Sequence, residues 1–213
     1  MNIQQLNNIS MKKYLIYLMM AAAVVMSGAC FPDKDNKPET PEIEVPEKPD
    51  DGEGGSKILV VYFSWGGTTR RMAQEIVRQT GADIFQIEPA APYPTEYTPC
   101  TEVAREEKEK NARPAIANKV ENWNSYDTIF IGCPVWWWTT PMIICTFAES
   151  YNFEGKTVVP FCTYASTYRD ETLARIVELT PDAGHLTGEG LTSGRINEKN
   201  ISSWLEKIGM NRQ

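Results

Sequence analysis

Continuous apolar segments alternate along the chain with segments of helical periodicity, beginning at Lys57. The first, KILVVYF, is apolar throughout, as expected for a parallel strand that helices cover on both faces. The pattern predicts four further strands, Asp83 to Glu88, Thr128 to Cys133, Thr157 to Cys162 and Leu186 to Leu191. It predicts helices at Thr68 to Thr80, Pro141 to Tyr151, Asp170 to Leu179 and Glu198 to Ile208. Five strands with interposed helices predict a three-layer α/β fold with a doubly wound parallel sheet.

The segment between the second and third predicted strands, Pro89 to Lys119, is longer than most connections. Its portion from Thr101 to Asn111 is strongly charged and predicts a short helix. We interpret this insertion as a solvated flap, and the alternative is a direct role at a binding site. Ligands in open sheets of this class bind at the carboxyl ends of the strands, so functional residues should follow strands.

The loop after the first strand combines hydroxyls, glycines and the start of a helix. It reads Ser64-Trp65-Gly66-Gly67-Thr68-Thr69. Glycines permit close backbone approach, hydroxyls donate hydrogen bonds, and a helix start attracts anions. The loop therefore predicts a phosphate site, the alternative being a tight turn capped by Thr68. Arg70 and Arg71 follow in the first helical turn, where they either support a bound phosphate or are solvated surface residues.

Three consecutive tryptophans follow the third strand, in the segment Cys133-Pro134-Val135-Trp136-Trp137-Trp138-Thr139-Thr140-Pro141. Thr140 and Pro141 resemble the cap and first residue of the next helix, which places the tryptophans on a loop. Three exposed indoles would form an adhesive patch unless a ligand, a partner or the insertion covers them. We expect at least one to stack on a ring-shaped ligand, and packing against the insertion is the alternative for the other two.

The amino-terminal segment is typical of a bacterial secretion signal. A basic start at Met11 to Lys13 precedes sixteen mostly apolar residues, which are too few to span a bilayer. The run ends at Ser27-Gly28-Ala29-Cys30, which resembles a lipobox and predicts lipidation of Cys30. We therefore predict a signal peptide over residues 1–29, with Met11 as the start, and a membrane-anchored, extracytoplasmic protein in the periplasm or at the cell surface. A plain signal peptide is the alternative.

Residues 30–56 comprise Cys30 and a predicted disordered tether, and residues 57–213 a single folded domain. Between residues 31 and 56 lie five prolines and nine acidic residues against three lysines, with almost nothing to bury. The formal charge of the whole chain is −7, so nucleic acid is not an expected partner.

The remaining cysteines are Cys100, Cys133, Cys145 and Cys162, without the spacing of a metal site. Cys133 and Cys162 each close an apolar strand and are interpreted as buried thiols in preference to a disulfide. The single histidine, His185, is interpreted as a surface residue.

Several motifs together resemble the flavodoxin family over nearly all of Lys57 to Gly209. They are YFSWGGTTRRMA, EPAAPYPTEY, NARP, SYDTIFIGCPVWWWTTP, FEGKTVVPFCTYAS and the WLEKIG ending. The resemblance is closest to the branch with a PYPxxY insertion and a tryptophan-rich loop. It implies a flavodoxin-like sheet of strand order 2-1-3-4-5 and the cofactor flavin mononucleotide, FMN.

The resemblance also implies where the cofactor would lie. Ser64, Trp65, Gly66, Gly67, Thr68 and Thr69 would hold the phosphate. Pro134, Val135, Trp136, Trp137 and Trp138 would form one side of the isoalloxazine site, and Thr163, Tyr164 and Ala165, within the segment to Thr167, the other. Trp136 is the preferred stacking residue because it is the first aromatic after Pro134. Trp138, nearest the helix, is expected in the core.

The implied function is electron transfer to a redox protein, or NAD(P)H-dependent reduction of a small acceptor such as a quinone. No side chain in these loops is an obvious acid, base or nucleophile, so no catalytic residue is assigned. The alternative is a non-catalytic binding lipoprotein that has lost FMN, because residues 163–168, TYASTY, crowd the third loop. The sequence lacks the G-x-G-x-x-G spacing that dinucleotide binding requires. A serine hydrolase would need Ser64 beside His185, but the two residues are expected at opposite edges of the predicted sheet.

Overall fold

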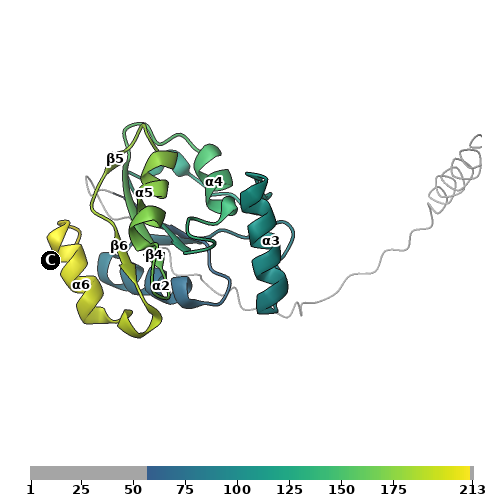
Figure 1. The fold of residues 1–213 in the computed structure, drawn as a ribbon. Helices are drawn as coiled ribbons and strands as arrows, with labels where there is room; N and C mark the ends of the chain where they lie inside the picture. The colour runs from purple at the N-terminus through teal and green to yellow at the C-terminus, as the bar shows by residue number, and fades with distance from the viewer. Residues whose placement is uncertain (1–56, 212–213) are drawn as a thin grey trace, which may run out of the picture. The chain divides into compact units, whose positions relative to one another are not determined.

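A computed structural model describes residues 57–211 of the chain, which form a parallel sheet between layers of helices (Figure 1). The predicted signal peptide, Cys30, the tether and the last two residues lie outside the described residues. The strands are β1 (Ile58–Tyr62), β2 (Asp83–Gln86), β3 (Thr128–Pro134), β4 (Thr157–Thr163), β5 (Gly184–His185) and β6 (Glu189–Leu191). The helices are α2 (Thr68–Thr80), α3 (Tyr97–Glu109), α4 (Met142–Glu149), α5 (Arg169–Leu179) and α6 (Glu198–Lys207), with short 3-10 turns η1 (Trp123–Ser125) and η2 (Ser193–Arg195).

The strand order is β2-β1-β3-β4-β5, with β6 also paired to β4, and every pairing is parallel. The register aligns Val60 of β1 with Ile84 on one side and Phe130 on the other. This arrangement confirms the predicted doubly wound sheet with strand order 2-1-3-4-5. It also brings the loops that follow β1, β3 and β4 to the same edge of the sheet.

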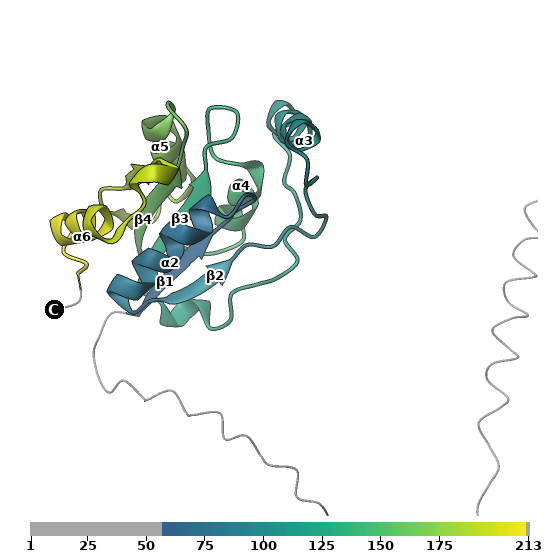
Figure 2. The ribbon, with the colours of Figure 1, turned by 90° about the horizontal axis from the view of Figure 1, so that it is seen from below.

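Two helices cover each face of the sheet, as Figure 2 shows for α2 and α6. Alternate residues of the central strands point to opposite faces because the side-chain period of a strand is two. Leu59 and Val61 of β1 pack with α4 and α5, whereas Val60 and Tyr62 pack with α2 and α6. The uninterrupted apolar strands in the sequence therefore reflect burial on both faces.

Helix α2 begins and ends at the predicted residues, Thr68 and Thr80. Helix α3 begins at Tyr97, four residues before the predicted start, because Pro99 is tolerated within the first turn of a helix. The predicted cap of α4 is wrong. Pro141 has an extended conformation (φ −56°, ψ 145°) and itself precedes the first helical residue, Met142.

The last predicted strand, Leu186 to Leu191, is wrong over its first half, because residues 186–188 are not in a strand and only Glu189–Leu191 is. The chain instead makes two short strands, and β5 pairs with Thr157 and Val158 whereas β6 pairs with Phe161 to Thr163. The break lies opposite Pro160 of β4, which has no N–H to donate to a ladder. Gly188 passes so close that a Cβ there would lie 2.5 Å from the Pro160 carbonyl oxygen.

The four cysteines of the described residues are buried and unpaired, which confirms the interpretation of Cys133 and Cys162 as thiols. His185 is partly exposed, so it lies at the surface as interpreted, and its Nε2 lies 2.9 Å from the Thr180 hydroxyl. Between residues 57 and 211, none of the helices has the length and apolar character needed to cross a membrane.

Candidate functional site

A cavity of about 890 Å³ opens at the carboxyl ends of β1, β3, β4 and β6. Thirteen of the fourteen predicted cofactor residues line it: Ser64, Trp65, Gly66, Thr68, Thr69, Pro134, Val135, Trp136, Trp137, Trp138, Thr163, Tyr164 and Ala165. Gly67 does not line the cavity, and neither do Ser166 and Thr167. Three loops that are far apart in the sequence thus converge on one site.

Seven residues that line the cavity were missed by the sequence reasoning. They are Tyr97, Cys100, Thr101 and Ala104 from α3, and Thr192, Ser193 and Gly194 after β6. The second group carried a usable signal, because small polar residues after a strand lie at the same sheet edge as the other loops. The first group carried none, because the charged pattern of α3 indicates a solvated helix.

The loop between β1 and α2 is ordered by its own backbone and side chains. The Ser64 hydroxyl accepts a hydrogen bond from the Gly67 N–H at 3.1 Å, and Gly67 has a left-handed φ of 83°. The first intrahelical bond runs from the Arg71 N–H to the Gly67 carbonyl at 3.1 Å. Helix geometry therefore leaves the N–H groups of Thr68 and Thr69 without an acceptor inside the helix. Thr68 is the first helical residue and not a cap, so the alternative of a Thr68-capped turn is wrong.

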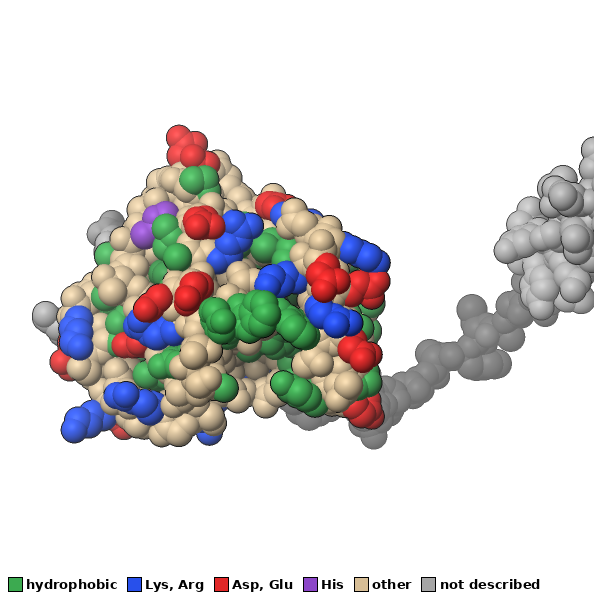
Figure 3. Space-filling view, in the orientation of Figure 1, with side chains coloured by type: hydrophobic (Ala, Val, Ile, Leu, Met, Phe, Trp, Pro, Cys, Tyr) green, Lys and Arg blue, Asp and Glu red, His purple; other side chains and the backbone are tan. Residues whose placement is uncertain are grey.

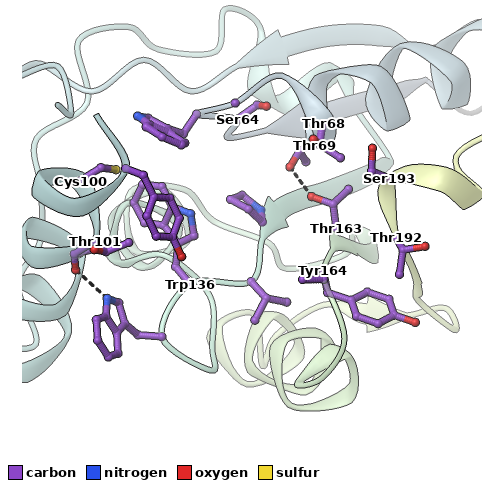
Figure 4. A pocket seen from close by; sticks show the side chains of 18 of the residues that line it. Ser64, Thr68, Thr69, Cys100, Thr101, Trp136, Thr163, Tyr164, Thr192 and Ser193 are labelled. Carbon is purple, nitrogen blue, oxygen red and sulfur yellow. Dashed lines mark hydrogen bonds between the residues drawn. The ribbon is translucent and has the colours of Figure 1, made fainter. Parts of the chain in front are cut away.

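Hydroxyl groups gather at the end of the cavity nearest α2 (Figure 4). Thr69 and Thr163 lie 2.8 Å apart through their hydroxyl oxygens, and both side chains are buried. The Val135 N–H donates to the Thr163 carbonyl at 2.9 Å, which joins the loops after β3 and β4. One end of the cavity is therefore polar and uncharged.

Arg71 binds Ser193 and does not point into the cavity. Its guanidinium donates hydrogen bonds to the carbonyl and the hydroxyl of Ser193, which fastens the first turn of α2 to the loop after β6. Neither Arg70 nor Arg71 lines the cavity. The interpretation of the two arginines as supports for an anion is not borne out by their positions.

The tryptophan-rich loop is a tight turn in which Trp136 and Thr139 exchange backbone hydrogen bonds of 3.0 and 3.1 Å. The two residues between them, Trp137 and Trp138, have left-handed φ values of 45° and 71°. Such values are rare for bulky residues and cost free energy. The turn therefore depends on contacts from elsewhere in the molecule.

Each indole of the turn has a different environment. Trp136 packs edge-on against Phe63 and Tyr93, with ring centroids 5.2 and 5.1 Å apart. Trp138 is 56% exposed and lies 5.8 Å from the ring of Tyr168, so its expected place in the core is wrong. The face in Figure 3 accordingly carries a cluster of hydrophobic side chains with Lys and Arg beside it.

The insertion forms a wall of the cavity, and its interpretation as a solvated flap is wrong. Helix α3 buries Cys100 and Ala104. The Trp137 indole N–H donates to the Thr101 carbonyl at 2.7 Å, a bond drawn in Figure 4, and Lys108 donates to the Trp137 carbonyl at 2.7 Å. On the other side the Trp65 indole N–H donates to the Pro94 carbonyl at 2.8 Å.

No Asp, Glu, Lys or Arg is among the lining residues of this cavity in the described part of the chain. Cys100 is 3% exposed, and burial together with the nearby Glu107 carboxyl raises the pKa of its thiol. Cys100 therefore stays protonated at neutral pH. Ser64 bonds within its own loop and His185 bonds to Thr180, so the pair required of a serine hydrolase is not formed.

Comparison with known proteins agrees with this geometry. The family model for flavodoxin matches residues 57–208, most of the chain. The chain belongs to the flavodoxin family. Its sheet order is that of a flavodoxin-like domain.

Two solved structures share more than 30% of their residues with this flavodoxin-family chain. A protein from Bacteroides eggerthii, described as a flavoprotein, is 38% identical and covers 73% of this chain and 99% of its own, with a TM-score of 0.64. A protein from Bacteroides uniformis, also described as a flavoprotein, is 31% identical. It covers 72% of this chain and 99% of its own, with a TM-score of 0.64. A flavoprotein from Lactobacillus acidophilus, solved in complex with FMN, is 21% identical and shares the fold. It covers 70% of this chain and 99% of its own, with a TM-score of 0.60. The search of curated proteins gave no match.

Proposed function

We propose that the cavity binds FMN and that the domain is a redox flavoprotein. The observation that carries this proposal is the contrast between the two ends of one cavity. One end offers hydroxyls and the first N–H groups of α2, and the other is walled by aromatic rings. An amphipathic ligand with an anionic group and a flat ring system matches both ends. FMN is such a ligand, and the L. acidophilus protein of the same fold was solved in complex with it.

The phosphate of FMN fits the loop from Ser64 to Thr69. Helix starts bind phosphate through their unpaired N–H groups and the positive end of the helix dipole, without a cation. A Cβ added at Gly66 would meet nothing within 4 Å, so the backbone of this loop is open to close approach. Among the described residues no Lys or Arg lines the cavity, so the phosphate would be held by neutral donors.

The isoalloxazine fits between the loops after β3 and β4. Pro134 to Trp138 would contact one side and Thr163 to Ala165 the other, and the bond from Val135 to Thr163 sets the separation of the two loops. Trp136 is held edge-on by Phe63 and Tyr93 and supplies a rigid wall. Rigid walls reduce the entropy lost on binding.

A bound flavin supplies one- and two-electron transfer, and this chain supplies binding, orientation and exclusion of water. The titratable side chains of the lining are Tyr97, Cys100 and Tyr164, and the Cys100 thiol is held protonated. None is placed as an acid or base. The function proposed is therefore electron transfer to a redox partner, or NAD(P)H-dependent reduction of a small acceptor such as a quinone.

Binding is tested by titrating the purified chain with FMN and with riboflavin while flavin fluorescence is followed. FMN should bind at least about tenfold more tightly, because riboflavin lacks the phosphate that the helix start recognises. Equal affinities would show that the loop from Ser64 to Thr69 is only a turn. No binding of either flavin would favour the non-catalytic alternative.

The Trp136→Ala variant tests the ring site. It should weaken FMN by about tenfold, through lost burial and lost ring packing. Trp204→Phe is a control for changes in the tryptophan background, because Trp204 of α6 is buried against Phe130 and does not line the cavity.

We further propose that Cys30 carries a lipid that anchors the protein outside the cytoplasm, which rests on the lipobox-like Ser27-Gly28-Ala29-Cys30 alone. Stable anchoring requires more than one acyl chain. Cells grown with radiolabelled palmitate should label the wild type and not Cys30→Ala, and the variant should leave the membrane fraction. Equal labelling of the two proteins would contradict the anchor.

A further inference from the structure

A second cavity, smaller than the cofactor cavity, lies beside helix α3. It encloses about 210 Å³ and is lined by Arg105, Lys108, Glu109, Trp137 and Trp138. It shares the two tryptophans with the cofactor cavity, but its three charged residues are absent from the lining of that larger cavity. We call it the α3 side cavity. Its chemistry differs from that of the site described above, because its lining carries charge.

The three charged residues come from one face of α3. Arg105, Lys108 and Glu109 are three and four residues apart, a spacing that brings side chains together on the surface of a helix. Arg105 and Glu109 are exposed, and Lys108 is half-buried. The tryptophan turn supplies the rest of the wall, so charged groups and ring surface line the same small space.

Lys108 supplies a positive charge that is held in place by the turn. Its ammonium donates a hydrogen bond to the Trp137 carbonyl at 2.7 Å and lies 4.8 Å from the ring centroid of Trp138. An ammonium has three N–H groups, so the bond to Trp137 does not exhaust its donors. A ligand anion can therefore be bound by Lys108 without disturbing the turn.

Arg105 has donors that the described part of the chain does not use. Its guanidinium lies 5.9 Å from the ring centroid of Trp137, and its Nε lies 3.9 Å from a carboxylate oxygen of Glu109. That separation is too long for a hydrogen bond. Within residues 57–211 the guanidinium has no hydrogen-bond partner. A guanidinium presents paired N–H groups that match the two oxygens of a carboxylate.

The charge and size of the α3 side cavity indicate the class of its ligand. Two cations and one carboxylate leave a single positive charge in the lining, which favours a monoanion over a dianion such as a phosphate ester. Trp138 is 56% exposed and offers ring surface to a flat partner. The volume of about 210 Å³ is below the range usual for drug-sized ligands, about 300–1,000 Å³, so a single ring is expected.

We propose that the α3 side cavity binds a small aromatic monocarboxylate, with its carboxylate on Arg105 and Lys108 and its ring against Trp138. The proposal goes beyond the function proposed above and does not rest on FMN binding. It assigns a second, anionic ligand to a domain whose larger cavity has no Asp, Glu, Lys or Arg among its described lining residues.

Benzoate is the probe, and its binding to the purified full chain is followed by NMR titration at constant ionic strength. Benzamide has the same ring without the charge, and acetate has the charge without the ring. Benzoate should bind at least about tenfold more tightly than either. The proposal is overturned if benzoate does not bind, if benzamide or acetate binds as tightly, or if inorganic phosphate binds more tightly.

Substitutions at exposed positions of α3 locate the bound benzoate. Arg105→Met removes the guanidinium but keeps an apolar stem, and should weaken benzoate by at least about tenfold without changing benzamide. Glu109→Gln removes the only carboxylate of the lining and should strengthen benzoate by about two- to threefold. Glu106→Gln makes the same change of net charge at an exposed residue outside the cavity and should have no effect.

Circular dichroism checks that each variant is folded. Equal benzoate affinity in the wild type and in folded Arg105→Met would overturn the location. Should Arg105→Met not fold, Glu109→Gln decides, because equal effects of Glu109→Gln and Glu106→Gln would likewise overturn it.

The same titration with added FMN distinguishes the two cavities. FMN should change the affinity for benzoate by less than about threefold, because the charged residues that hold the carboxylate do not line the cofactor cavity. Loss of benzoate on saturation with FMN would place benzoate in the cofactor cavity and overturn the proposal. A chain that binds benzoate as predicted but no FMN refutes the proposed function and supports this inference.

Discussion

Two turns border the same cavity and reach left-handed backbone geometry by opposite routes. The loop after β1 places Gly67 at φ 83°, where a glycine adopts the conformation at little cost. The loop after β3 places Trp137 and Trp138 at φ 45° and 71°, where bulky side chains are strained. The first geometry is set by the residue itself, and the second by its surroundings.

The surroundings of the tryptophan turn are supplied by the insertion. Lys108 donates to the Trp137 carbonyl and Thr101 accepts from the Trp137 indole, so one helix binds the turn at two points. Strained backbone persists only where neighbouring structure holds it, and it gathers at functional sites. The comparison predicts that the first turn is damaged by changing its own residue and the second by changing its partner.

Substitution at Gly67 should have the largest effect. Gly67→Val places a β-branched residue at a left-handed φ and should lower the free energy of unfolding by ~2 kcal/mol. Nothing lies within 4 Å of the added Cβ, so the effect is conformational. A displaced loop should also weaken FMN by about tenfold. Denaturant unfolding and FMN titration measure the two effects.

Gly209→Val is the matched control for this variant. Gly209 has a similar φ of 70°, open space around it and a position after α6, away from the cavity. It should lose stability to a similar extent and leave FMN affinity unchanged. Equal loss of FMN affinity in the two variants would show that the Gly67 loop acts only through overall stability.

Removal of the ammonium that holds the tryptophan turn should have a smaller effect. Lys108→Met keeps the length of the side chain but loses the donor to the Trp137 carbonyl, and should lower the free energy of unfolding by ~1 kcal/mol. Backbone amides of Trp137 and Trp138 should exchange hydrogen faster. Lys110→Met, which loses only an exposed pair with Glu106, should cost less than ~0.5 kcal/mol. Equal losses of unfolding free energy in the two variants would contradict this prediction.

A glycine in the strained turn should cost little, the reverse of the result at Gly67. Trp138→Gly relieves the left-handed backbone but loses the ring contact with Tyr168 and the cation contact with Lys108. The relief of backbone strain opposes the loss of these contacts, and each contribution is ~1 kcal/mol. The free energy of unfolding should therefore stay within ~1 kcal/mol of wild type. A loss as large as that of Gly67→Val would mean that the backbone of this turn is not strained.

The pH dependence of stability should show the smallest effect, through Glu107 on the buried side of α3. Burial raises the pKa of its carboxyl, while Tyr93 donates a hydrogen bond to it at 2.9 Å. The folded chain therefore holds this proton more tightly than the unfolded chain, and stability falls as pH rises above the ordinary glutamate range, about 4.3.

The Glu107→Gln variant removes this titration but keeps an oxygen that accepts from Tyr93. Unfolding free energies of both proteins are measured at acidic and neutral pH. The variant should lose less stability on going to neutral pH than the wild type does, because carboxyls elsewhere titrate equally in both proteins. Parallel pH profiles would contradict the assignment.

The sequence by itself determined the elements and most of the site. Apolar runs buried on both faces specify parallel strands, so the sheet could be predicted, and the residues themselves marked the loops after β1 and β3 as candidate sites. The cavity residues after β4 were implied only by the resemblance to the flavodoxin family. The Ser64 to Thr69 loop is encoded locally by its glycines and hydroxyls. The boundaries of α2 follow likewise from the pattern of one helix.

Only the tertiary structure decided what the insertion and the tryptophans do. The charged pattern of α3 does not reveal that its uncharged face closes the cavity, because that depends on where the chain returns in space. The exposure of Trp138 is set by a turn that Lys108 and Thr101 hold from another segment. The division of the last strand into β5 and β6 depends on Pro160 of the neighbouring strand. Local patterns record which residues are apolar, whereas partners distant in sequence decide which of them meet.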